Sequence, residues 1–268
     1  MADIAWKDGE INYTDEGKGK LTLMLVHGFC ESLRMWDDWK QPFLKGDWRL
    51  VCVDLPGFGN STATGDTIET YAASINALVS SLELEQVIMI GHSMGGYVTL
   101  AVAETEPDWL KGIGLFHSHP YADNEDTREK RNRSIAFIEE NGHFHYLKQL
   151  IPRLFPSSRA GSYTHQQDRM MLLASRASQE GIINGQRAMR DRLDRSAFLK
   201  ETELPVLFIN GALDETVSEA QRRDQLALPC RAQLCFLPKA GHMGFIEDSR
   251  ATQRAVREFL SFCQEFFD

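Results

Sequence analysis

The stretch that decides the fold is Gly91-His92-Ser93-Met94-Gly95-Gly96. It lies between the apolar run Val87–Ile90, which predicts a buried strand, and the amphipathic stretch Met94–Glu106, which predicts a helix. A Gly-x-Ser-x-Gly sequence in this position allows a very sharp turn, because the glycines leave space where a Cβ atom would not fit. The turn places the Ser93 hydroxyl at a helix N-terminus, where free N–H groups favour negative charge. Ser93 is therefore a candidate nucleophile, and a tight turn without chemistry is the alternative.

Short apolar runs alternate with longer amphipathic stretches along most of the chain. The expected buried strands are Leu21–Val26, Leu50–Val53, Val87–Ile90, Ile113–Phe116, Val206–Ile209 and Leu234–Leu237. The expected helices between or after them are Thr67–Leu82, Met94–Glu106, Ser218–Leu228 and Arg250–Phe267. This alternation predicts an α/β fold, with a mainly parallel sheet that helices cover on both faces. Ile4–Trp6 and Ile11–Tyr13 flank a short polar turn and predict an antiparallel hairpin at the sheet edge.

Residues 118–199 break the alternation, because this segment contains no convincing strand. Its expected helices are Arg128–Glu140, Phe144–Leu150, Gln166–Ala177 and Gly181–Leu193, with breaks at Pro152 and Pro156. Functional connections in open α/β sheets lie at the carboxyl ends of the strands. We therefore expect a core domain formed by residues 1–117 and 200–268, covered by a helical cap formed by residues 118–199.

Two further residues follow expected strands at the same edge of the sheet as Ser93. Asp214 lies just after Val206–Ile209, and His242 lies just after Leu234–Leu237. Each alone has a plain interpretation, a helix-capping carboxylate or a loop histidine. Together they supply the residue types of a nucleophile, its general base and the acid that orients the base, in the chain order Ser, Asp, His.

A third loop, His27-Gly28-Phe29, ends the strand Leu21–Val26. The backbone N–H of Phe29, together with that of Met94, is placed to form an oxyanion hole. Gly28 is expected to let the chain turn close to a substrate. Taken alone, a His-Gly turn is equally consistent with a plain loop.

Composition limits the classes of function. The net charge of −9 argues against nucleic-acid binding, which needs a basic surface. No apolar run approaches the length of a membrane span, and the N-terminus lacks the basic and apolar pattern of a signal peptide. The five cysteines are odd in number and scattered, which argues against a disulfide framework and favours a reducing, cytoplasmic location.

The motifs taken together resemble the α/β-hydrolase superfamily over nearly the whole chain. They are His27-Gly28-Phe29, the segment 54–61, Gly91–Gly96, the segment 211–214 and Gly241-His242. The resemblance implies an eight-stranded sheet, a helical cap between the sixth and seventh strands, and a Ser93–His242–Asp214 triad. It points to the lid-bearing branch of esterases, lactonases, cofactor-free haloperoxidases and carbon–carbon bond hydrolases. A serine at position 93 argues against the dehalogenases and epoxide hydrolases of this superfamily, which use aspartate.

The expected activity is hydrolysis of a small ester-like substrate, a carboxylic ester or lactone, through an acyl-enzyme on Ser93. Carbon–carbon bond hydrolysis or a lyase reaction on the same triad is one alternative, and a non-catalytic ligand-binding protein of this fold is another. No cofactor is expected. The expected partner is a small-molecule substrate, with neither nucleic acid nor membrane, and the chain is expected to be a monomer or a homodimer.

Several polar and aromatic residues are candidates for the substrate pocket. Glu31 and Trp36 follow the oxyanion loop, and His119 follows the strand Ile113–Phe116; Trp36 is as consistent with the core. His117 and His119 form a His-x-His pair, yet no third ligand at a fitting spacing accompanies them, so no metal is expected.

Charge differs between the two expected parts of the chain. Residues 118–200 hold 14 Lys and Arg against 10 Asp and Glu, within a chain of net charge −9. Attraction between a basic cap and an acidic core is the plain interpretation. The sharper hypothesis is that cap arginines bind a substrate carboxylate, with Arg128, Arg131 and Arg169 as candidates on expected helices.

Overall fold

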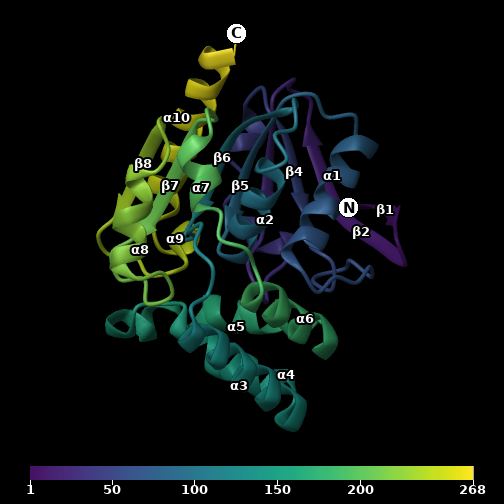
Figure 1. Ribbon diagram of the computed structural model, residues 1–268, viewed down its shortest axis with the longest axis vertical. Coiled ribbons are helices and arrows are strands. Elements are labelled where there is room, and N and C mark those ends of the chain that lie inside the picture. Colours follow the sequence, from purple (N-terminus) through teal and green to yellow (C-terminus); the bar gives the residue numbers. More distant parts are fainter. Residues whose placement is uncertain (268) are drawn as a thin grey trace.

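The computed structural model describes residues 1–267 (Figure 1). Within them, one sheet holds eight strands in the order β1-β2-β4-β3-β5-β6-β7-β8. The strands are β1 (Ala2–Trp6), β2 (Gly9–Gly17), β3 (Thr22–Val26), β4 (Arg49–Val53), β5 (Val87–His92), β6 (Leu110–Phe116), β7 (Val206–Gly211) and β8 (Ala232–Leu237). β1 and β2 form an antiparallel edge hairpin, β2 pairs antiparallel with β4, and all other neighbours are parallel. The predicted α/β fold is confirmed.

Helices cover both faces of this sheet. They are α1 (Ile68–Ser81), α2 (Met94–Ala103), α8 (Glu219–Asp224), α9 (Gly244–Glu247) and α10 (Ser249–Phe267), with short 3₁₀ turns η1 (Leu33–Trp36), η2 (Phe43–Lys45), η3 (Ser157–Tyr163) and η4 (Gln225–Ala227). Every residue of β3 and β5 is buried, and successive side chains of a strand point to opposite faces, so both faces are covered. Within residues 1–267, no helix combines the length and the apolar character that crossing a membrane requires.

Five helices connect β6 to β7 in the segment that we call the cap. They are α3 (Glu125–Asn141), α4 (His143–Arg153), α5 (Thr164–Ala174), α6 (Gln179–Arg190) and α7 (Ser196–Glu201). In Figure 1, α3 to α6 gather beyond one end of the sheet. Two details differ from expectation: α4 runs through Pro152 to Arg153, and α7 crosses the expected boundary at residue 199. Pro152 falls in the last turn of α4, so the helix still ends almost immediately after it.

The expectation that Leu234–Leu237 forms a fully buried strand is wrong. β8 is an edge strand, and its residues alternate between exposed and partly buried. Leu234 is 50% exposed and Phe236 is 56% exposed. The reason is that α10 packs against the face of β8 that carries Cys235, and the side chains of Leu234 and Phe236 point to the opposite face. An apolar run alone does not distinguish an edge strand from a central one.

The cap meets the core where two glycines touch, and this contact is open to a stability test. A Cβ added to Gly181, in the first turn of α6, would lie 2.3 Å from the carbonyl oxygen of Gly57. Gly181→Ala should therefore lower the free energy of unfolding by about 1–3 kcal/mol through overpacking, although alanine favours a helix. Gly161→Ala is the control, because nothing lies within 4 Å of its added methyl group. Equal thermal unfolding temperatures for the two variants would contradict this close approach.

Candidate active site

The turn between β5 and α2 holds Ser93 in a strained conformation. Ser93 has φ 50° and ψ −116°, in a region that a side chain with a Cβ rarely occupies. Its N–H donates to Phe116 O at 2.9 Å, and Ser118 Oγ donates to Ser93 O at 2.8 Å. These two hydrogen bonds hold the Ser93 backbone in its strained conformation. Backbone strain of this kind is typical of a functional site.

The glycines around Ser93 are required by close backbone contacts. A Cβ at Gly91 would lie 2.2 Å from Gly95 O, as the sequence predicts for a sharp turn. A Cβ at Gly95 would instead lie 2.5 Å from Val26 O on β3. The second glycine is therefore needed because the start of α2 lies against the neighbouring strand.

Asp214 and His242 come together at the ends of β7 and β8. His242 Nδ1 lies 2.9 Å from Asp214 Oδ2, and the Asp214 side chain is fully buried. The other oxygen, Oδ1, accepts the N–H groups of Thr216 at 2.8 Å and Val217 at 3.2 Å. Burial opposes the charge, but the neighbouring His242 and His117 and these hydrogen bonds outweigh it, so the pKa of Asp214 lies well below its ordinary value. An ionised Asp214 fixes the proton of His242 on Nδ1 and leaves Nε2 as the basic nitrogen.

The cap and the turn at Ser93 both hold the backbone of His242. The His242 N–H donates to Leu154 O at the end of α4, at 3.0 Å, and His242 O lies 2.9 Å from Nε2 of His92, the residue before Ser93. Ser93 Oγ itself has no hydrogen-bond partner among residues 1–267, so the Ser93–His242 pair stays a prediction. Such bonds often tighten only when a substrate is bound.

A second histidine, His117, contacts the same carboxylate oxygen, which the sequence did not predict. His117 Nδ1 lies 3.2 Å from Asp214 Oδ2, and its Nε2 accepts the N–H of Gly244 at 3.1 Å. Nδ1 therefore carries the proton, and burial, partly offset by Asp214, lowers the pKa of His117 to about 4. Its only sequence signal is the polar His-x-His that directly follows β6.

His117, Asp214 and His242 lie close enough together to be considered as metal ligands. Both rings, however, carry a proton on Nδ1, the nitrogen nearer to the Asp214 carboxylate. A metal needs the lone pair of a deprotonated ring nitrogen, so this tautomer arrangement suits an acid–base site rather than a cation site.

The predicted oxyanion donors have no competing partners. The Phe29 N–H donates to none of the described residues, and Met94 is the first residue of α2, where N–H groups lack an intrahelical acceptor. The Phe29 ring packs edge-on against Phe58 of the core and Tyr146 of the cap, at 6.0 and 6.4 Å between ring centroids. The oxyanion hole remains a prediction that this arrangement permits.

Two of the three predicted pocket residues are buried against other protein groups. Trp36 is fully buried and packs against aromatic rings of the core. Glu31 is also buried, and its carboxylate accepts the Gly28 N–H at 2.7 Å instead of facing a ligand. His119 contacts Tyr97 Oη of α2 at 3.3 Å, and burial, reinforced by Arg192, lowers its pKa to about 3. Its role in a pocket stays a prediction.

Comparison with known proteins identifies the family of this chain. The family model described as alpha/beta hydrolase fold matches residues 22–249. The chain belongs to the α/β-hydrolase fold family. This α/β-hydrolase is 27% identical to a solved thermophilic esterase from Thermogutta terrifontis, with a TM-score of 0.88, and the match covers 95% of this chain and 94% of that one.

Two curated relatives of this α/β-hydrolase have different names. It is 28% identical to the dihydrolipoyllysine-residue acetyltransferase component of the acetoin cleaving system of Pseudomonas putida, over 91% of this chain and 64% of that protein. It is 26% identical to the pimeloyl-[acyl-carrier protein] methyl ester esterase of Edwardsiella ictaluri, over 91% of this chain and 94% of that protein. The chain spans only 38% to 64% of the length of the first relatives that it matches.

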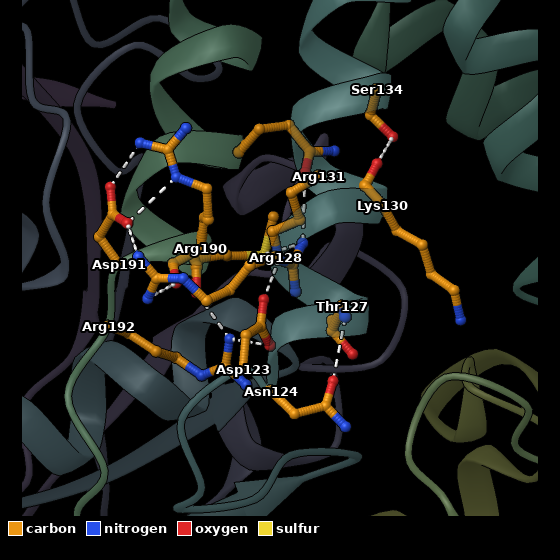
Figure 2. Close-up of polar contacts among 12 residues, drawn as sticks. Asp123, Asn124, Thr127, Arg128, Lys130, Arg131, Ser134, Arg190, Asp191 and Arg192 are labelled. Atoms are coloured by element: carbon orange, nitrogen blue, oxygen red, sulfur yellow. Dashed lines mark hydrogen bonds and ion pairs between the residues drawn. The ribbon is translucent and has the colours of Figure 1, made fainter.

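The three cap arginines proposed to bind a substrate carboxylate are already paired with protein carboxylates. Figure 2 shows Arg131 and Arg192 converging on Asp123, with Arg128 and Arg190 on Asp191. Arg169 pairs across the cap boundary with Asp38 of the core. The plain interpretation, attraction within and between the two parts of the chain, accounts for these contacts.

The fixed protonation of the buried histidines predicts a simple pH profile. The pKa values of His27, His117 and His119 are lowered, mainly by burial, and that of Asp214 lies well below its usual range. His117 and His119, with pKa values of about 4 and about 3, stay neutral above about pH 5. If His242 is the general base, kcat/KM should therefore rise with pH through a single deprotonation, because only a neutral imidazole accepts the Ser93 proton. A neutral ester that does not ionise is the substrate to use. A flat profile, or a rise that depends on two protons, would contradict the assignment of His242 as the base.

Proposed function

We propose that this α/β-hydrolase cleaves a small carboxylic ester or lactone through an acyl-enzyme on Ser93. The observation that carries the proposal is the orientation of His242, whose Nδ1 is bound to Asp214 while its backbone carbonyl contacts the residue next to Ser93. Its basic Nε2 is thereby free to serve the nucleophile. Two proteins among those compared above are named esterases, which supports an ester substrate.

The reaction follows from these positions. His242 Nε2 takes the proton of the Ser93 hydroxyl while Oγ bonds to the carbonyl carbon of the substrate. The N–H groups of Phe29 and Met94 stabilise the resulting oxyanion, and Asp214 stabilises the imidazolium. The His242 proton then passes to the leaving alcohol as the carbon–oxygen bond breaks. Water, activated by His242, attacks the acyl carbon and releases the acid and free Ser93.

Replacement of the nucleophile tests the proposal. Ser93→Ala should lower kcat for a short aryl ester by roughly 10⁶-fold, because the covalent step is lost, while the unfolding temperature stays close to that of the wild type. Ser80→Ala, at an exposed position on α1, is the matched control and should keep full activity. Most of the wild-type rate in Ser93→Ala would refute the mechanism. Faster turnover of a vinylogous diketone than of any ester would favour carbon–carbon bond hydrolysis instead.

A further inference from the structure

A buried pair, Glu31 and His92, lies directly beneath the oxyanion loop and outside the proposed triad. His92 Nδ1 lies 3.0 Å from the Glu31 carboxylate, and His92 Nε2 lies 2.9 Å from His242 O. The two side chains are 0% and 2% exposed. The proposed mechanism assigns no chemical step to either residue, although burial of two such groups is costly.

The partners of His92 determine its charge. A backbone carbonyl only accepts hydrogen bonds, so Nε2 must carry a proton. Nδ1 faces a carboxylate that also accepts the Gly28 N–H at 2.7 Å. Burial alone lowers the pKa of His92 and raises that of Glu31, but their mutual attraction and hydrogen bonds reverse both effects, so the pair is ionised. His92 is therefore an imidazolium beside the site.

The Glu31 carboxylate, and not the aromatic surroundings of His92, favours this charged form. The rings of Phe245 and Phe116 lie edge-to-face with His92, at 5.0 and 5.9 Å between centroids, and contribute to its burial. The other titratable groups that face His92 are His242 at 5.0 Å, His117 at 6.0 Å, His27 and Asp214. Glu31 is the carboxylate in direct contact with it.

The pair connects three loops of the proposed site. Glu31 holds the Gly28 N–H of the oxyanion loop, His92 belongs to the turn that presents Ser93, and His242 O belongs to the loop of the general base. A Cβ at Gly28 would lie 2.8 Å from His92 Nδ1 and 3.0 Å from Glu31 Oε2. The glycine at position 28 is therefore required by this pair, and its close approach to a substrate stays a prediction.

We infer that Glu31 and His92 are positioning residues, an ion pair that sets the Phe29 N–H and the His242 ring relative to Ser93. Neither touches a substrate, and both act through the backbone groups that they hold. This inference rests on the proposed function, because Phe29 and His242 matter only if Ser93 attacks a carbonyl. Misplacement of reacting groups by about 1 Å costs roughly 100-fold in rate.

Two substitutions of Glu31 separate the role of its hydrogen bonds from a general effect on folding. Glu31→Ala removes the acceptor for Gly28 and the partner of His92, and should lower kcat per titrated active site by about 10- to 100-fold with little change in KM. Glu31→Gln can still accept from Gly28 and donate to a neutral His92, so it should keep most of the wild-type kcat. Glu85→Gln, at an exposed position, is the control.

Histidine NMR supplies a readout that does not depend on activity. With ¹⁵N-labelled histidine, the signals that disappear in His92→Gln should show both ring nitrogens protonated at about pH 6 in the wild type, and a neutral ring in Glu31→Gln. A neutral His92 in the wild type would overturn the inference, as would wild-type kcat in Glu31→Ala. An inactive wild type with a charged His92 would instead refute the proposed function and leave the ion pair established.

Discussion

The turn at Ser93 constrains everything around it. A serine at φ 50° is tolerated only because Gly91 and Gly95 let the turn lie directly against its own helix and against β3. The same close approach brings the preceding residue, His92, beneath the oxyanion loop and beside the loop of His242. A residue with a Cβ at either glycine would separate these loops, because the added atom would lie only 2.2 Å (Gly91) or 2.5 Å (Gly95) from a backbone oxygen.

The protonation states of the histidines and of Asp214 in the site are set by neighbouring protein groups rather than by solvent. Backbone N–H donors fix His27 and His117 as neutral rings, each with Nε2 as an acceptor. Two oxygen acceptors hold His92 as a cation, and Asp214 remains an anion with four close polar partners. His242 is then the one group of this cluster whose proton is free to move. Because the surrounding charges are already in place, they need little reorganisation when the base exchanges its proton. Such preorganisation is the main source of electrostatic catalysis.

The sequence predicted the strands along the chain, the edge hairpin and the loop positions of Ser93, Asp214 and His242. Each of these depends on a local pattern, an apolar run followed by a polar loop. The sequence did not predict that Glu31 pairs with His92, 61 residues away, because such a contact depends on how two loops pack. For the same reason it did not predict the contact between His117 and Asp214. Four of the five cap helices were predicted within a few residues, and α7 was not. The ion pairs of the cap were not predicted either, because they require the faces of several helices to be known at once.

The proposed mechanism requires that Ser93 is a nucleophile activated by His242. Mass spectrometry after treatment with a fluorophosphonate tests this requirement directly, because the reagent reacts covalently with an activated serine and only weakly with an ordinary hydroxyl. A single adduct per chain is expected, on the peptide that contains Ser93, and the adduct should be lost in His242→Gln. An unmodified Ser93 in a protein that hydrolyses esters, or an adduct that forms equally well without His242, would contradict the mechanism.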